Sequence, residues 1–306
     1  MFILHSDDIL VICNKLSDKD KLSLCATSKR FHTMKCYLWF ETPKTSLEIV
    51  NLPYFDQFRR VIVCCDTKDK LPAFVTHLVF DDTFDQPIDK YIPNTVTHIK
   101  FGCDFNKPID SCIPESVTSI KFGYWFNHPI DGHIPKSLTH LKLGFGFSHS
   151  LRESISSVTH LTISNFTSKN KYISPSVTHL TIGDYKGTNI KDHIPASVTH
   201  LAFDRWFNKS IRNCVPPTVT HLTFGFRYDQ PIYKCIPATI THLTFGFRFN
   251  EAVDYNIPES VTHISFGQMF QQSINALPDT IVSITLHKKY KCQISQHLIP
   301  KITFTE

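Results

Sequence analysis

Apolar and polar residues recur along most of the chain with a period of about 21 residues. Each unit contains Val-Thr-His-Leu-x-Phe or a close variant, and this apolar–polar alternation is typical of a half-buried β-strand. The first residues of these motifs lie at positions 75, 96, 117, 138, 158, 177, 198, 219, 240, 261 and 281. A single short strand cannot bury its apolar face, whereas stacked copies bury one another's. We therefore predict an α+β chain in which residues 71–306 form a solenoid of about eleven coils, with one short parallel strand per coil.

The residues that follow each predicted strand also occupy regular columns. An aromatic residue is followed by an Asn-like residue, then an apolar residue, and the unit closes on Ile-Pro, as at Ile92-Pro93. Proline breaks helices and cannot donate to a strand ladder, so each unit must turn there. A coil this short leaves little room for a helix, and we expect extended or 3₁₀ structure on the convex side. The columns weaken over residues 148–190, where we expect an irregular coil or a bend.

Nine of the seventeen histidines follow a threonine at the start of a predicted strand. They are His77, His98, His140, His160, His179, His200, His221, His242 and His263. These side chains should point away from the buried face and stack at the inter-strand distance of about 4.8 Å. Zinc needs about four ligands around one point and catalysis needs a unique constellation, whereas a uniform row supplies neither. We interpret the row as structural; the alternatives are a pH-sensitive surface and, third, a metal or catalytic site.

Composition narrows the class of protein. The net charge is +5 in 306 residues, and the basic residues are spread along the chain, which does not favour nucleic acid as a partner. We expect no signal peptide and no membrane-spanning helix, because the first residues lack a basic stretch and no long apolar run occurs. The ten cysteines lack metal-binding spacing, which favours reduced thiols in the cytoplasm or nucleus. We predict no cofactor and no membrane partner.

Positions that vary between units should carry the binding information, because the constant columns fix the fold. Two positions after the start of the strand, three successive units carry Lys100, Lys121 and Lys142. Further along the coils, the variable positions with aromatic or arginine side chains include Trp125, Phe145, Arg205, Trp206, Phe226, Arg227, Phe247 and Arg248. Arginine and aromatic residues are typical anchors of protein interfaces. We predict a target-binding rim at Lys100, Lys121, Lys142, Trp125, Phe145, Arg205, Trp206, Arg227 and Arg248; the alternative is that the aromatics fill turns between coils.

The first forty residues do not repeat and are predicted to form three short helices. Ser6 is a candidate N-cap for the first, and Ser17 with Asp20 resembles a capping box that opens the second. Ser28 is a candidate N-cap for a third helix that ends near Trp39. We assign residues 1–40 to a helical domain and residues 41–70 to a linker and irregular first coil. Three such helices bury too little to be stable alone, so a partner or the solenoid must cover them.

Two resemblances follow from these motifs. The spacing V-x-x-L-x-F with its Asn-like column resembles the leucine-rich repeat, with phenylalanine in place of several leucines. The segment FNKPIDSCIPESVTSIKFG, residues 105–123, is similar to the FNIP repeat, a relative of the leucine-rich repeat. The resemblance covers about residues 71–300. It implies a solenoid that binds other proteins.

The helical segment resembles an F-box, through Leu-x-x-Asp-Asp-Ile-Leu from Leu4, a second motif LSDKDKLSLCATSKRFH and a terminal Leu-Trp. It departs from the family at His5, where the usual proline is missing. The resemblance implies docking to the Skp-type adaptor of a cullin–RING ubiquitin ligase. The matching docking residues are Leu4, Ile9, Leu10, Ile12, Leu16, Leu22 and Leu24. The alternative is a helical cap that shields the first coil.

Three hypotheses of function follow. The first is a non-catalytic substrate-recognition subunit of a ubiquitin ligase, whose solenoid binds an unknown target protein. The second is a solenoid interaction scaffold without a ligase link, and the third is single-stranded nucleic-acid binding by the lysine and aromatic columns. F-box and FNIP repeats together are known from social amoebae and from large viruses that infect amoebae. The resemblance implies such an origin, with a viral protein acting in the host cytoplasm.

Overall fold

The computed structural model describes residues 10, 11, 13, 15–27, 29–64, 71–88, 92–110, 112–151, 155–167, 172–185, 190 and 193–306. The chain divides into two compact units. The first comprises Met1–His128 and Gly132–Leu138, and the second comprises Pro129–Asp131 and Thr139–Glu306.

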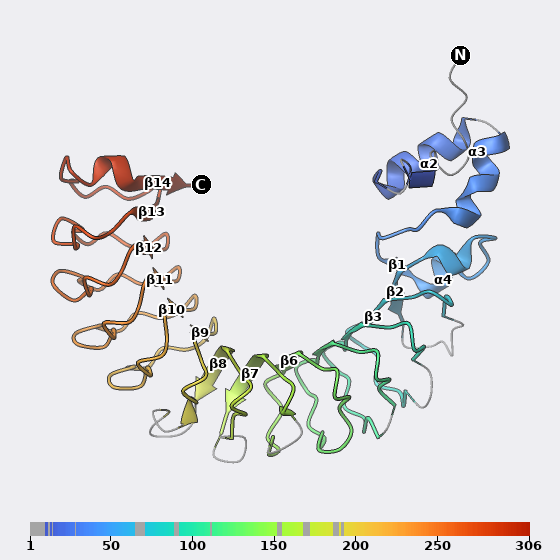
Figure 1. Ribbon diagram of the computed structural model, residues 1–306, viewed down its shortest axis with the longest axis horizontal. Coiled ribbons are helices and arrows are strands. Elements are labelled where there is room, and N and C mark those ends of the chain that lie inside the picture. Colours follow the sequence, from blue (N-terminus) through green and yellow to red (C-terminus); the bar gives the residue numbers. More distant parts are fainter. Residues whose placement is uncertain are drawn as a thin grey trace. The chain divides into compact units, whose positions relative to one another are not determined.

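The first unit begins with helices and continues as parallel coils (Figure 1). Residues 10, 11 and 13 are helical. The elements that follow are α2 (Asp18–Ala26), α3 (Lys29–Thr33), η1 (Met34–Tyr37), β1 (Lys44–Thr45), α4 (Ser46–Ile49), η2 (Phe55–Gln57), β2 (Arg60–Val63), β3 (His77–Phe80), β4 (His98–Lys100) and β5 (Ser119–Lys121). Strands β1 to β5 pair in chain order, and every pair is parallel.

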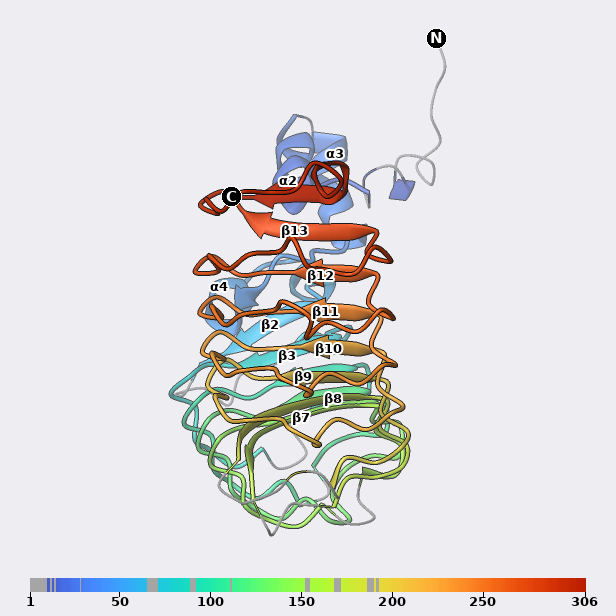
Figure 2. The same ribbon diagram turned by 90° about the vertical axis from the view of Figure 1, so that its left-hand side faces the viewer.

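The second unit carries one strand per coil, and Figure 2 shows strands β9 to β13 stacked in sequence. Its elements are β6 (His140–Leu143), β7 (His160–Phe166), β8 (His179–Tyr185), β9 (His200–Phe203), β10 (His221–Thr223), β11 (His242–Thr244), β12 (His263–Ser265), β13 (Ser283–His287), η5 (Ile299–Lys301) and β14 (Ile302–Thr305). Neighbouring strands are parallel throughout.

The register of the strands follows the sequence period. Strand β10 pairs with β11 so that His221 lies opposite His242 and Leu222 opposite Leu243. The described residues between successive strands from β3 to β13 form turns, extended segments and short 3₁₀ turns. The predicted solenoid, with one parallel strand per coil and little helix outside the strands, is confirmed.

Stacked aromatic rings form the core of each unit. In the first unit Phe101 and Phe122 stack with ring centroids 5.2 Å apart, and Phe105 stacks on Phe126 at 6.0 Å. In the second unit Phe249 stacks on Phe270 at 6.1 Å, and all these rings are at most 1% exposed. Full burial of one such side chain contributes about 1.5–3 kcal/mol, so the two phenylalanine columns are a large source of stability in the coils that carry them.

The Asn-like column supplies hydrogen bonds between coils. The side-chain oxygen of Asn106 accepts the backbone N–H of Asn127 at 2.9 Å, and Asp229 accepts the N–H of Asn250 at 3.0 Å. Hydroxyls before the strands act in the same way, since Ser116 donates to the carbonyl of Val96 at 2.7 Å. These bonds satisfy backbone groups in the turns, where no strand ladder is available.

The described part of residues 148–190, where an irregular coil or a bend is expected, carries longer strands than the other coils. Strands β7 and β8 each have seven residues and pair over Asn165 and Asp184 without a break in register. Asn165 also donates through its side-chain nitrogen to the carbonyl of Phe145 at 2.8 Å. Longer strands therefore replace the lost Phe-Asn turn in the described part of this region.

The parallel ladder extends into residues 41–70, for which the sequence pattern predicts a linker and an irregular first coil. Strand β2 pairs with β3 so that Arg60 lies opposite His77, and β1 pairs with β2. Phe40 is buried and stacks on Phe58 at 5.0 Å. The repeat motif is absent here, so the period does not indicate these coils. The helices belong to the same compact unit as these strands.

Tyr228 provides a test of the aromatic core. It occupies the phenylalanine column with 0% exposure, and its buried hydroxyl makes no hydrogen bond to the described residues. Burial raises the pKa of this hydroxyl. We expect Tyr228→Phe to raise the free energy of unfolding by about 1 kcal/mol, because an unsatisfied polar group is removed. The measurement is the urea midpoint of both proteins.

Tyr290 is the matched control, because its hydroxyl donates to the carbonyl of Gln272 at 2.8 Å. The Tyr290→Phe change should lower the free energy of unfolding by about 1 kcal/mol. A loss of stability in both variants would contradict the account of Tyr228.

Candidate binding surfaces

The predicted capping of the second helix is confirmed. Ser17 precedes α2 with an extended backbone and its Oγ accepts the N–H of Asp20 at 3.2 Å. The third helix begins at Lys29 as α3 and tightens into the 3₁₀ helix η1, which ends at Tyr37. The cap expected for it, Ser28, and the first cap, Ser6, lie outside the described residues.

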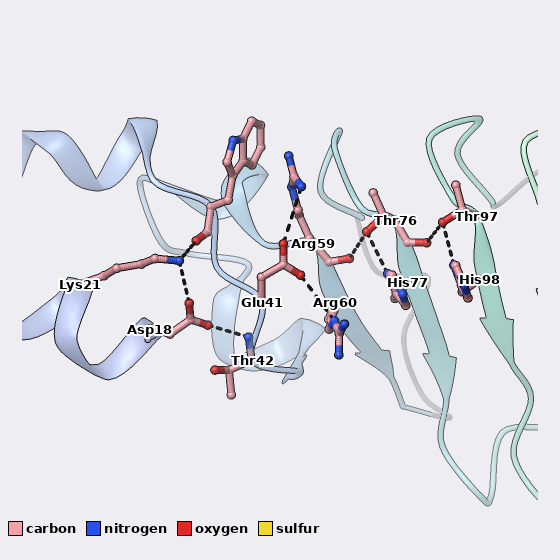
Figure 3. A network of polar contacts seen from close by, with 11 residues as sticks. Asp18, Lys21, Glu41, Thr42, Arg59, Arg60, Thr76, His77, Thr97 and His98 are labelled. Atoms are coloured by element: carbon pink, nitrogen blue, oxygen red, sulfur yellow. Dashed lines mark hydrogen bonds and ion pairs between the residues drawn. The ribbon is translucent and has the colours of Figure 1, made fainter. Parts of the chain in front are cut away.

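Helix α2 is held to the following chain by polar contacts. The buried Lys21 donates through Nζ to the carbonyl of Trp39 at 2.6 Å and lies 3.2 Å from the Asp18 carboxylate (Figure 3). Asp18 in turn accepts the N–H of Thr42 at 2.6 Å. Burial alone would raise the pKa of Asp18, but the hydrogen bonds from Thr42 and Lys21 outweigh it and lower that pKa. The helix is therefore anchored to the segment that leads into β1.

Of the predicted adaptor-docking leucines that the structure describes, two are exposed and two are half-buried. Leu16 and Leu22 are 37% and 39% exposed, and Leu10 and Leu24 are half-buried. Leu4, Ile9 and Ile12 lie outside the described residues. Val11 and Tyr37 are also exposed apolar side chains of this segment, at 61% and 66%, and the sequence does not single them out because they match no F-box position.

The Thr-His pairs form the predicted ladder. In the second unit the rings from His140 to His263 stack in chain order with centroids 4.1–4.4 Å apart, and in the first unit His77 and His98 stack at 4.3 Å. Each Nδ1 lies 2.8–3.0 Å from the hydroxyl of the preceding threonine, as for His77 and His98 in Figure 3. The predicted stacking of the histidine row is confirmed.

The threonine hydroxyls lie near both a backbone carbonyl and a ring nitrogen, which couples their donor role to the tautomer of the histidines. Thr220 Oγ1 donates to the carbonyl of Thr199 at 3.3 Å and lies 2.9 Å from Nδ1 of His221. A hydroxyl has one proton, so a bond to the carbonyl requires Nδ1–H to donate to Oγ1. The Nε2 atoms of near-parallel rings then point the same way and do not converge. Among the described residues, no group of three or more His, Cys, Asp or Glu is placed to hold a metal ion.

The ladder predicts loss of stability in acid. The pKa values of His77, His160, His179, His221 and His242 are lowered from 6.5, first by burial and then by neighbouring histidines or other charges. Below pH 6.5 the unfolded chain therefore binds more protons than the folded chain. The contribution of these histidines to the free energy of unfolding should be complete above pH 6.5. It should be lost as the pH falls through their pKa values in the folded protein.

The measurement is the urea midpoint between about pH 7.5 and pH 4.5. A His179→Gln, His221→Gln double variant removes two of the perturbed groups, so its midpoint should depend less on pH. Equal pH dependence in the two proteins would contradict this role of the ladder.

The predicted target-binding residues do not all lie together. Lys100 and Lys121 are exposed and face each other across β4 and β5, and Lys142 is exposed on β6. Trp125 is 57% exposed in the first unit, and its ring meets that of Tyr124 edge-on. Phe145 is half-buried in the second unit.

The remaining four predicted residues come together in the second unit. The guanidinium carbons of Arg227 and Arg205 lie 4.2 Å and 5.1 Å from the ring centroid of Trp206. Beside them Phe226 and Phe247 stack at 4.6 Å, next to Arg248. This is the only cluster among the described rim residues that combines exposed arginine and aromatic side chains across successive coils.

The chain matches the FNIP Repeat family over residues 67–104, 105–146, 188–227, 207–248, 228–268 and 249–289, which together exceed half of its length. The chain belongs to the FNIP repeat family. Helices α2, α3 and η1 precede the first matched FNIP repeat. No helix among the described residues is long and apolar enough to cross a membrane.

This FNIP repeat chain is similar to a viral protein and to a protein of known structure. A putative FNIP repeat-containing protein, R636, of Acanthamoeba polyphaga mimivirus is 33% identical over 81 residues, which are 26% of this chain and 21% of that protein. The crystal structure of CroV588, described as a novel circular LRR protein, superposes with a TM-score of 0.60 at 32% identity. The superposition covers 81% of this chain and 40% of CroV588. The resemblance to FNIP and leucine-rich repeats is thereby confirmed, and the chain spans less than half of either relative.

Proposed function

We propose that this FNIP solenoid is a non-catalytic substrate receptor of a cullin–RING ubiquitin ligase. The N-terminal helices would dock a Skp-type adaptor, and the coils would hold a target protein. The mechanism is proximity, because holding the target beside the ligase raises the effective concentration of its lysines at the conjugating enzyme. The proposal rests on the F-box resemblance together with one observation in the helical segment.

That observation is the choice of side chains that α2 buries. The residues that α2 buries are Lys21 and Cys25, while Leu22 points outward and Leu16 before the helix is exposed. A buried lysine beside exposed leucines is the reverse of the usual distribution. The Lys21 and Asp18 bonds fix this orientation, so the outward leucines are available to a partner that supplies an apolar surface.

The anchoring of α2 also matters for the proposed mechanism. The bonds from Lys21 to Trp39 and from Asp18 to Thr42 tie the helix to the chain that enters β1. In this proposal the two bonds would keep the docking helix in one orientation on the first unit, so that the adaptor meets a preformed surface.

The test is the affinity of the full chain for a recombinant Skp-type adaptor, measured by titration calorimetry. Leu22→Asp should weaken binding about 30- to 100-fold, because a charge replaces an apolar anchor in the interface. Leu47→Asp is the matched control, since Leu47 is 57% exposed on α4 in the same unit. Its affinity should stay within about twofold of the original.

Point variants are preferable to removal of the helices. Leu38 and Phe40 are at most 1% exposed, and Phe40 stacks on Phe58 before β2, so a truncated chain would lose part of that core. Equal affinity of the Leu22→Asp and original proteins would reject the docking surface. Absence of any adaptor binding would leave the second hypothesis, an interaction scaffold whose helices form a cap.

A further inference from the structure

Six side chains form a surface on the coils of β9, β10 and β11, which we call the Arg–aromatic stripe. They are Arg205, Trp206, Phe226, Arg227, Phe247 and Arg248, of which Phe247 is half-buried and the others are exposed. They occupy the same two positions after the strand in three successive coils, and each position faces its equivalent in the next coil. The stripe therefore runs along the solenoid axis, across the coils.

The backbone beneath the stripe is ordered by the solenoid itself. The N–H of Arg227 donates to the carbonyl of Arg205 at 3.0 Å, and the N–H of Arg248 donates to the carbonyl of Phe226 at 3.0 Å. The same bond recurs one coil further, from Met269 to Phe247. Because these bonds fix the turns, the side chains of the stripe are presented at a constant spacing.

Ring contacts hold the side chains in place. The Arg227 guanidinium lies over Trp206 at 4.2 Å and Arg205 lies at 5.1 Å from the same ring. Phe226 and Phe247 stack with an interplanar angle of 8°. A guanidinium that lies on a ring keeps its N–H edge outward, which suits bidentate binding of a carboxylate.

The positive charge of the stripe is not neutralised by the ion pairs that the structure describes. None of those pairs involves Arg205, Arg227 or Arg248. The nearest carboxylate in the sequence, Asp204, accepts the N–H of Trp206 at 2.9 Å. Two coils beyond Arg248 the same positions carry the exposed residues Lys288 and Lys289, which extend the positive charge.

We propose that the Arg–aromatic stripe binds an extended acidic segment of a protein, in which carboxylates alternate with apolar or aromatic side chains. The arginines would pair with the carboxylates, and Trp206 with Phe226 would contact the apolar groups. This inference rests on the proposed function in one respect, namely that the solenoid holds a target protein. It adds the chemical class of the segment that is held.

The spacing of the coils sets the length of the acidic segment that the stripe can bind. Coils repeat at the strand spacing of about 4.8 Å, and an extended chain rises about 3.3 Å per residue. Four coil intervals separate Arg205 from Lys288, so the surface from one to the other spans roughly 19 Å and accommodates about six extended residues.

The ring contacts favour a peptide over single-stranded nucleic acid. Base stacking needs open aromatic faces in succession. Here one side of the Trp206 ring is occupied by Arg227, and Phe226 and Phe247 cover each other. The stripe exposes the edges of its guanidinium groups, which can bind carboxylates, and the edges of its rings, which can contact apolar side chains.

The test measures fluorescence anisotropy of a fluorescein-labelled random copolymer of glutamate and tyrosine bound to the full chain. The Arg227→Gln, Arg248→Gln double variant should lose affinity about tenfold or more. Arg212→Gln with Lys234→Gln is the matched control, because both residues are exposed in turns of the same unit. It removes the same charge and should keep the affinity within about twofold.

Three results would overturn the proposal: equal losses in the two double variants, no binding of the copolymer, or tighter and stripe-dependent binding of a labelled 20-nucleotide oligothymidylate. If the protein bound labelled polyglutamate as tightly as the glutamate–tyrosine copolymer, the aromatic rings of the stripe would have no role in binding, which would contradict that part of the proposal. The Leu22→Asp protein should bind the copolymer normally, and the stripe variant should bind the adaptor normally. Failure of the stripe and failure of the adaptor docking are thus distinguishable.

Discussion

Phe249→Ala will lower the free energy of unfolding of the second unit by about 3–5 kcal/mol, the largest effect we expect from a single side chain. Phe249 is fully buried and its ring lies 3.9 Å from Phe245, 6.2 Å from Tyr228 and 6.1 Å from Phe270, measured between centroids. The rings of three successive coils therefore lose contacts when this one is removed. The cavity cannot collapse easily, because the strands on both sides are held in register.

The measurement is the urea midpoint of the variant together with its slope. Phe226→Ala is the control, since Phe226 is 40% exposed and lies on the stripe of the same unit. It should cost about 1 kcal/mol or less. If the two substitutions lower the free energy of unfolding equally, the buried aromatic column does not stabilise the coils as we expect.

Gly246→Ala should lower the free energy of unfolding by roughly 2–4 kcal/mol, although it adds only a methyl group. A Cβ at Gly246 would overlap the carbonyl of Gly225 in the preceding coil and lie 3.0 Å from the carbonyl oxygen of Phe224. Backbone, rather than a flexible side chain, occupies that space. Two coils must therefore separate to admit the methyl group.

Ser164→Ala is the matched control for Gly246. Ser164 occupies the same position of its coil within strand β7 and already carries a Cβ. The change should alter stability by about 0.5 kcal/mol or less. Thermal unfolding monitored by circular dichroism compares both variants. A Gly246→Ala protein as stable as the original would show that the coils are not packed this closely.

The repeat part of the fold can be predicted from the sequence because successive coils carry the same residue types at the same positions and bury them in the same way. The Val-Thr-His-Leu spacing locates each strand, and the 21-residue interval predicts that His221 lies opposite His242, as it does. The cap at Ser17 is equally local, since one side chain and one N–H three residues away suffice.

Other features depend on contacts that the sequence does not reveal. The motif is absent from β1 and β2, whose strands form because they extend the ladder from β3 and bury Phe40 and Val61. The burial of Lys21 depends on the carbonyl of Trp39, eighteen residues away. The sequence indicates the rim residues one by one, but only the coil register shows that Arg227 lies over Trp206.

We propose that the FNIP solenoid is joined to a ligase adaptor through the outward face of α2. Amide hydrogen exchange of the full chain, with and without a recombinant Skp-type adaptor, shows whether this docking occurs. We predict slower exchange over residues 15–27 on adding the adaptor, and unchanged exchange over strands β9 to β13. Protection confined to the coils, or no protection at a saturating adaptor concentration, would contradict the claim.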